Sequence, residues 1–175
     1  MEKELVKQAK KGNKKAFEEI ILHYQNDLYR IAKTRFNDEE DINDAIQETI
    51  ISAYESIGKL FNTDKIKSWL ITILINKCNH IYKQKQKNNF ISYDNINAER
   101  YVSSLDKNDS DLEFNNLINL LNDDEKTIIV LYYAEGYKAK EIAKILKMKE
   151  STVRNKILRA KRKIQNDLEE VSNYG

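Results

Sequence analysis

Two short amphipathic segments near the C-terminus constrain the fold more strongly than any other part of the sequence. The apolar residues of the first segment share one side, and they are Ile142, Ala143, Ile145 and Leu146. Those of the second are spaced four, three and four residues apart, and they are Val153, Ile157, Ala160 and Ile164. This spacing forms one stripe along a helix. The three residues 147–149 between the segments have the length of the turn in a helix-turn-helix motif.

The other face of the second segment carries mainly polar and basic side chains that can reach DNA phosphates and base edges. Its residues are Ser151, Thr152, Arg154, Asn155, Leu158, Arg159 and Arg162. Residues 138–163 include eleven Lys and Arg but only two acidic residues, whereas the whole chain has a net charge of +2. Such a local excess is expected for a polyanion partner. A solvated basic helix is the alternative, but it explains neither the turn length nor the two apolar stripes.

The chain contains no proline and only four glycines, which indicates helix throughout. Barrels and sandwiches need turn residues at short intervals, so we predict an all-α fold. The single cysteine, Cys78, excludes an internal disulfide and suits a reducing compartment. The charged N-terminus lacks the apolar region of a signal peptide, and the longest apolar run, 69–75, is too short to span a bilayer. We therefore expect a cytoplasmic protein without membrane insertion of its own.

Helical periodicity divides the chain into two small helical domains, 1–89 and 111–175. The helices predicted in the first domain cover about 5–10, 15–36, 38–57 and 64–88, and those of the second precede and include the helix-turn-helix. The residues expected to begin or end helices are Gly12, Asn13, Asp38, Gly58, Asp111, Asn122 and Gly136. Residues 90–110 are acidic and lack periodicity, so we interpret them as a flexible linker.

The helix predicted over 38–57 has two different faces. Its core stripe is Ile42, Ile46, Thr49, Ala53 and Ile57. The second stripe is acidic, with one large apolar residue, and consists of Asp44, Gln47, Glu48 and Ile51. This combination is typical of a protein-docking surface, and a solvated helix face is the alternative.

The helix predicted over 64–88 also has an apolar and a polar side. The residues expected in the core are Ile66, Trp69, Leu70, Ile73 and Leu74. The polar side carries Asn76, Asn79, His80, Lys83 and Lys87, and amides and lysines on one helix face can track nucleic acid.

The sequence offers no catalytic constellation. It has no Gly-rich phosphate loop, no Ser/His/Asp set and no carboxylates paired in a cleft-like context, and His23 and His80 are isolated. Cys78 and His80 are two residues apart and cannot share a helix face, which argues against a metal site. We expect a protein that is not an enzyme and that has no metal site and no cofactor.

Four passages occur in the order and at the spacing of one known family. They are AFEEIILHYQNDLYRIA (16–32), DEEDINDAIQETIISAYESI (38–57), SWLITILINKCNHIYK (68–83) and LNDDEKTIIVLYYAEGYKAKEIAKILKMKESTVRNKILRAKRKI (121–164). Together they resemble bacterial RNA polymerase sigma factors of the extracytoplasmic-function (ECF) group, the minimal two-domain members of the sigma-70 family. In order, they look like the start of region 2, the polymerase-clamp-binding helix, the helix that contacts the -10 promoter element, and region 4, which reads the -35 element.

The resemblance implies three sets of site residues. The polymerase-binding set is Asp41, Asp44, Gln47, Glu48 and Ile51. The -10 set is Lys59, Phe61, Asn62, Thr63, Asn76, Asn79 and Lys83. The -35 set is the outward face of the second segment, where we expect Arg154 to read a base and Lys161, further along, to contact phosphate. Members of the group are commonly held inactive by an anti-sigma factor, so the resemblance implies such a partner beside core RNA polymerase and promoter DNA.

The sequence also departs from the family pattern. Lys138 and Lys149 stand where relatives usually have Ser or Thr, Lys147 replaces the turn glycine, and Phe61-Asn62 replaces a frequent Arg-Gly pair. The promoter preference of relatives is therefore not carried over to this chain.

We predict a sigma factor that directs promoter recognition and transcription initiation by core polymerase. The alternative is a helix-turn-helix regulator that binds DNA without polymerase. Such a regulator accounts for the C-terminal half but not for the basic face of the N-terminal helices.

Overall fold

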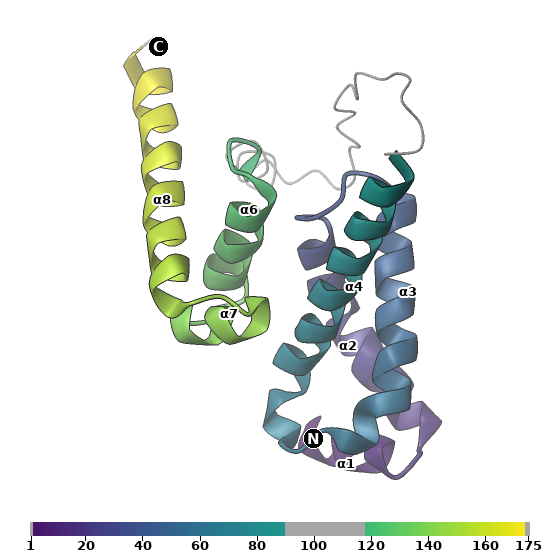
Figure 1. Ribbon diagram of the computed structural model, residues 1–175. Coiled ribbons are helices and arrows are strands. Elements are labelled where there is room, and N and C mark those ends of the chain that lie inside the picture. Colours follow the sequence, from purple (N-terminus) through teal and green to yellow (C-terminus); the bar gives the residue numbers. More distant parts are fainter. Residues whose placement is uncertain (1, 90–117, 174–175) are drawn as a thin grey trace. The chain divides into compact units, whose positions relative to one another are not determined.

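The computed structural model describes residues 2–89 and 118–173, and every regular element in these two ranges is a helix (Figure 1). The all-α prediction is therefore confirmed for the described part of the chain. The chain divides into two compact units, which are described separately below. The predicted linker, 90–110, and the predicted cap at Asp111 lie outside the described residues, so the domain boundaries stay predictions.

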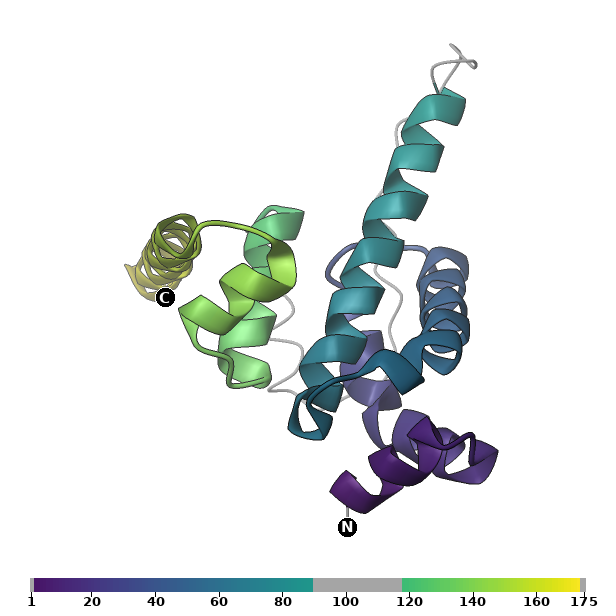
Figure 2. The same cartoon turned by 60° about the horizontal axis from the view of Figure 1, so that its bottom comes forward.

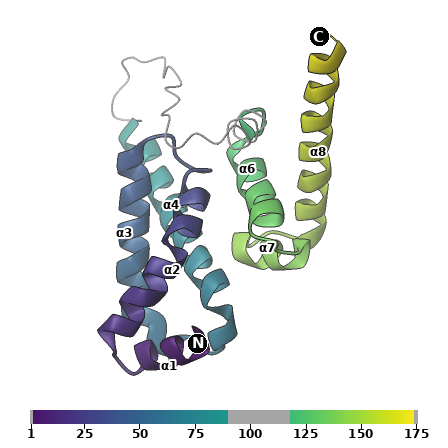
Figure 3. The same ribbon diagram turned by 180° about the vertical axis from the view of Figure 1, so that it is seen from behind.

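The first unit is a group of helices built around an antiparallel pair. Its elements are α1 (Glu2–Lys10), α2 (Lys14–Ala32), α3 (Glu39–Ser56), the short 3-10 turns η1 (Ile57–Lys59) and η2 (Thr63–Lys65), and α4 (Ile66–Asn89). Helices α3 and α4 run side by side, α2 packs against both, and α1 lies across one end (Figures 1 and 3). The long helix α4 extends past its neighbours at its C-terminal end (Figure 2).

Polar side chains cap the helices where the sequence predicts their starts. Gly12 has a φ of 91°, which a glycine adopts without steric cost, and Asn13 Oδ1 then accepts a hydrogen bond from the Ala16 N–H at 3.2 Å. Asp38 Oδ1 accepts a hydrogen bond from the Glu40 N–H at 3.0 Å at the start of α3. The acidic first turn of α3 also complements the positive end of the helix dipole.

Helix α4 buries a wider apolar face than the predicted stripe. Trp69 and Ile73, both predicted to lie in the core, are only partly buried, whereas Ile71, Ile75 and Cys78 are buried. The reason is that α4 packs against both α2 and α3, so it needs apolar side chains over two adjoining faces. Burial raises the pKa of the Cys78 thiol to about 12, so this thiol stays protonated at neutral pH.

The second unit contains the helix-turn-helix. The elements within its described residues, 118–173, include α6 (Asp123–Ile129), the π-helical turn η3 (Val130–Ala134), α7 (Ala139–Leu146) and α8 (Glu150–Asn173). Gly136 follows η3 with a φ of 72°, which confirms it as the residue that ends this helical segment. Three residues separate α7 from α8, as the sequence predicts.

Packing of α8 against α6 and α7 forms the core of the second unit. The predicted stripe residues Val153, Ile157 and Ala160 are buried, and Ala160 packs in a cluster with Leu121 and Ile129. At the start of α6, Asn122 Oδ1 accepts from the Glu125 N–H at 2.9 Å, and the Asn122 N–H donates to Glu125 Oε2 at 3.2 Å. This reciprocal pair is a capping box. No helix within the described residues has the length and apolar character needed to cross a bilayer.

Candidate protein and nucleic-acid interfaces

The predicted polymerase-binding residues lie along one side of α3, which we call the α3 face and define as Asp41, Asp44, Gln47, Glu48 and Ile51. Asp44 and Gln47 are exposed, and 58% of Ile51 is accessible to solvent. An exposed carboxylate and an exposed amide beside one exposed apolar side chain suit contact with a protein partner.

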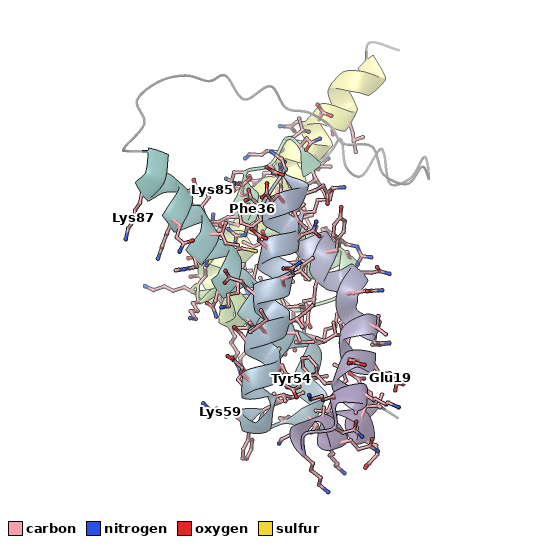
Figure 4. The ribbon with its side chains drawn as sticks, turned by 90° about the vertical axis from the view of Figure 1, so that its right-hand side faces the viewer. Glu19, Phe36, Tyr54, Lys59, Lys85 and Lys87 are labelled. Atoms are coloured by element: carbon pink, nitrogen blue, oxygen red, sulfur yellow. The ribbon has the colours of Figure 1, made fainter. Side chains whose placement is uncertain are left out.

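Two acidic residues of the α3 face are already paired with lysines of α4. Lys77 Nζ lies 3.3 Å from Glu48 Oε2, and Lys85 Nζ lies 2.5 Å from Asp41 Oδ2. These pairs link α3 to α4 at two points along the antiparallel pair, and Figure 4 shows Lys59 and Lys85 at opposite ends of this helix pair. The Asp41 side chain is largely covered by this contact, so Asp44, Gln47 and Ile51 form the accessible centre of the face.

The predicted -10 residues fall into two groups within the first unit. Lys59, Phe61, Asn62 and Thr63 belong to the loop between α3 and α4, where Leu60 is buried and Phe61 is fully exposed at 101%. Asn62 Oδ1 accepts from the Asp64 N–H at 3.0 Å and starts η2. The loop therefore presents an aromatic ring to solvent beside a buried anchor.

The second group lies further along α4. Asn76, Asn79 and Lys83 are exposed and spaced three and four residues apart, so they share one helix face. With a rise of 1.5 Å per residue, Asn76 lies about 15 Å along the axis from the start of α4. The predicted -10 residues thus form a track rather than a single cluster, which suits an extended strand of nucleic acid.

The predicted -35 residues are all exposed on α8. They are Ser151, Thr152, Arg154, Asn155, Leu158, Arg159 and Arg162. Because Val153, Ile157 and Ala160 are buried on the opposite side, α8 presents this face outward as a recognition helix does.

Comparison with known protein families matches both units. The family described as sigma-70 region 2 matches residues 20–88, and the family described as sigma-70, region 4, matches residues 111–164. This chain belongs to the sigma-70 family. It is 29% identical to the ECF RNA polymerase sigma-E factor of Haemophilus influenzae, with 94% of each chain covered. It is 24% identical to the RNA polymerase sigma-H factor of Pseudomonas aeruginosa, over 96% of this chain and 94% of that one.

A solved structure has the same fold as this sigma-70 family member. It is the sigma factor RpoE in complex with the anti-sigma factor NepR from Bartonella quintana, with 22% sequence identity and a TM-score of 0.68. The similarity covers 89% of this chain and 98% of that one. Relatives that match over 94% of this chain are named as ECF sigma factors, which places the chain in the ECF group of the family.

The region 4 unit keeps its helix-turn-helix despite the departures from the family pattern. Lys147, at the place of the turn glycine, has a left-handed φ of 54°. Lys138 caps α7 without a side-chain acceptor, and its backbone N–H instead donates to Glu141 Oε2 at 3.1 Å. The backbone therefore keeps the conformation that glycine would favour and retains one half of a capping box.

Several lysines of the basic region 4 segment contact the unit itself. Lys156 Nζ lies 3.5 Å from Asp124 Oδ2, and Lys163 Nζ lies 2.7 Å from Glu125 Oε2. Lys161 Nζ lies 5.6 Å and 5.5 Å from the ring centroids of the adjacent tyrosines 132 and 133 in η3. The sequence did not predict these contacts, because they join residues about thirty or more positions apart and no local pattern links such residues. The two ion pairs reduce the net outward charge below the sequence count, whereas Lys161 remains exposed.

The carboxylate of Glu125 is buried and ionised. Burial by itself would raise the pKa of Glu125, but the hydrogen bonds from Lys163 and from the Asn122 backbone, with the charges of Lys163 and Lys156, lower it. The Glu125 side chain thus links α6 to the recognition helix. The cap at Asn122 was predicted from the sequence but Glu125 was assigned no role, and a Glu three residues after a cap is the signal that could have identified it.

Proposed function

We propose that this chain works in the cytoplasm as a sigma factor, which binds core RNA polymerase, directs it to promoters and allows transcription to start. The observation that carries the proposal is that regions 2 and 4 match the two units of one chain in family order. The relatives that match over nearly the whole length are named as RNA polymerase sigma factors. The reaction itself would belong to the polymerase, so we propose no catalytic residue for this chain.

The three exposed faces divide the work. The α3 face docks on polymerase, the α3–α4 loop with the Asn76, Asn79 and Lys83 face of α4 binds the -10 element, and the outward face of α8 binds the -35 element. Each contact is small, but one rigid partner holds both DNA-binding units near their targets. Joint binding therefore gains effective concentration that neither unit has alone.

Phe61 supplies the means to hold an opened strand. A flipped or unstacked base needs a flat apolar surface to stack on, and base–aromatic stacking is worth roughly 1–3 kcal/mol per base. Phe61 is fully exposed next to the buried Leu60, so the ring reaches outward from an anchored backbone. Exposed amides on α4 then lie along the path of the same strand.

We also propose an anti-sigma factor as a regulatory partner. The Bartonella quintana sigma factor with the same fold was solved with the anti-sigma factor NepR bound. A partner that covers the α3 face or the α8 face would prevent polymerase or promoter binding.

The competing function, a helix-turn-helix regulator that acts without polymerase, is not favoured. It accounts for the region 4 unit alone and leaves the region 2 match and the exposed α3 face without a role.

Transcription in vitro with purified core polymerase separates the two functions. We expect promoter-specific transcripts only when this protein is added to core enzyme, and poor binding of the free protein to promoter DNA at about physiological salt. Tight, sequence-specific DNA binding by the free protein, without stimulation of core polymerase, would support the regulator.

A further inference from the structure

Helix α1 contacts the loop that carries Phe61, although α1 lies outside the residues matched to region 2. It packs against α2 through the buried Val6 and Ala9, and it also contacts η1 and η2 on either side of the loop. The region 2 match begins at residue 20.

Two lysines of α1 reach the two ends of this loop. Lys10 Nζ donates a hydrogen bond to the Leu60 carbonyl at 2.6 Å, and Lys3 Nζ lies 2.9 Å from Asp64 Oδ1. The residues between these two attachment points are Phe61, Asn62 and Thr63, three of the proposed -10 contacts. The loop is thus held from outside, by a helix about fifty residues earlier in the chain.

The Lys10 contact is the stronger of the two attachments. Lys10 is half-buried, and its ammonium donates a short charge-assisted hydrogen bond to a backbone carbonyl. The Lys3 and Asp64 side chains are 68% and 47% exposed, and exposed ion pairs contribute little because water and salt screen them.

Leu60 is the backbone position on which the direction of Phe61 depends. Its side chain is buried, its N–H donates to the Ile57 carbonyl at 3.1 Å, and its carbonyl accepts from Lys10. The carbonyl of Leu60 belongs to the peptide group that leads directly into Phe61. Fixing that peptide plane therefore restricts the orientation of the Phe61 backbone from which the ring projects.

We infer that Lys10 is a positioning residue for promoter opening: it orients the Leu60–Phe61 peptide so that the Phe61 ring is ready to receive an unstacked base. The inference rests on the proposed sigma-factor function. Lys10 itself does not contact the base. It acts through Phe61, and preorganisation of this kind lowers the cost of ordering the loop on binding.

The test compares full-length Lys10→Met, Lys10→Arg and Lys11→Met with the unsubstituted chain, each bound to core polymerase. Strand opening is measured by permanganate reactivity of thymines in the -10 region, and polymerase binding is measured separately. We expect Lys10→Met to reduce opening by about tenfold or more, tenfold being the lower end of the range for one hydrogen bond to a charged group. Lys10→Arg keeps a hydrogen-bond donor and should retain most of the strand opening. Lys11→Met removes one positive charge from the exposed neighbouring residue and should leave strand opening unchanged.

A double substitution separates positioning from general stability. If Lys10 acts through Phe61, then Lys10→Met should have little further effect in a Phe61→Ala background. The inference would be overturned if Lys10→Met and Lys11→Met opened promoters equally well, or if the effects of Lys10→Met and Phe61→Ala were additive. Either result would leave the sigma-factor function intact. Failure of the unsubstituted chain to open any promoter with core polymerase would reject the function and the inference together.

Discussion

Lys163 Nζ lies 2.7 Å from Oε2 of Glu125, and this ion pair joins the recognition helix α8 to the first turn of α6. Glu125 is buried, and the same carboxylate oxygen accepts the Asn122 backbone N–H in the capping box. One side chain therefore stabilises both the start of α6 and its packing against α8.

Glu125→Gln should destabilise the region 4 unit by roughly 1.5–3 kcal/mol at pH 7, because hydrogen bonds to a buried charge are lost. The folded state lowers the pKa of Glu125, so its contribution is fully present above the unfolded pKa, roughly 4.3, and is lost as pH falls through the lower folded value. The difference in free energy of unfolding between the variant and the unsubstituted chain should therefore shrink below about pH 4. Denaturant unfolding at several pH values measures it.

The matched control for Glu125 is Asp123→Asn, which removes an exposed carboxylate from the same first turn. It should cost only the helix-dipole contribution, about 0.3–1 kcal/mol. Equal destabilisation by the two substitutions would show that the ion pair with Lys163 contributes nothing specific.

Charge reversal on the α3 face should weaken binding to core polymerase. Glu48→Lys would place a second positive charge beside Lys77, and it would therefore also disturb the contact between α3 and α4. Asp44→Lys is the cleaner substitution because Asp44 is exposed, and we expect about a tenfold or larger loss of affinity with helicity unchanged. Pull-down with purified core enzyme measures the affinity. Glu19→Lys, an exposed reversal on α2, is the control, and unchanged affinity of Asp44→Lys would remove the α3 face from the proposal.

Arg154→Ala should relax the preference for one base pair of the -35 element. In the free protein, Arg154 Nη2 and Nε lie 2.5 Å and 3.0 Å from Glu150 Oε1. An exposed pair four residues apart is worth only about 0.3–0.5 kcal/mol, whereas a bidentate contact to guanine discriminates by about 1–3 kcal/mol. Arg154 can therefore leave Glu150 for a base. Transcription from a library of -35 variants tests this, and an unchanged preference profile would mean that Arg154 is only a surface ion pair.

Lys161→Ala should behave differently from Arg154→Ala. The Lys161 ammonium lies over the rings of Tyr132 and Tyr133 in η3 and remains exposed. A lysine held there can contact phosphate but reads no base, so its loss should lower activity evenly across promoter variants and flatten the salt dependence. A shift in base preference at any -35 position would contradict this role.

Lys147→Gly should stabilise the helix-turn-helix. A left-handed conformation costs a residue with a Cβ roughly 1–2 kcal/mol, and glycine avoids this cost but loses about 0.5–1 kcal/mol in conformational entropy. We expect a net gain of about 0.5–1 kcal/mol in the free energy of unfolding. Lys147→Ala retains the Cβ and is the control. Equal stability of the glycine and alanine variants would exclude backbone strain at this turn.

Most helix boundaries could be predicted because local side chains determine them. Asn13, Asp38 and Asn122 each accept a backbone N–H at a helix start, and Gly12 and Gly136 adopt positive φ values where helical segments are interrupted or end. The outward face of α8 was also predictable, since three buried apolar residues fix its orientation. These features depend on residues that are close together in the sequence.

Features that depend on distant contacts could not be predicted. Trp69 and Ile73 were placed in the core from one apolar stripe, but α4 packs on two neighbouring helices, and Ile71 and Ile75 are more buried. The π-helical turn η3 has no periodic signal in the sequence. Lys10 reaches a carbonyl fifty residues away, and no local pattern reveals such a partner.

The exposed ring of Phe61 also has a calorimetric consequence. Water surrounds the whole ring in the free protein, and removing apolar surface from water lowers the heat capacity. If the ring is covered only when a base leaves the duplex, the decrease in heat capacity accompanies strand separation. Formation of the preceding closed complex would not show it. The enthalpy of promoter opening by this chain would then vary with temperature, and Phe61→Ala would remove part of that variation.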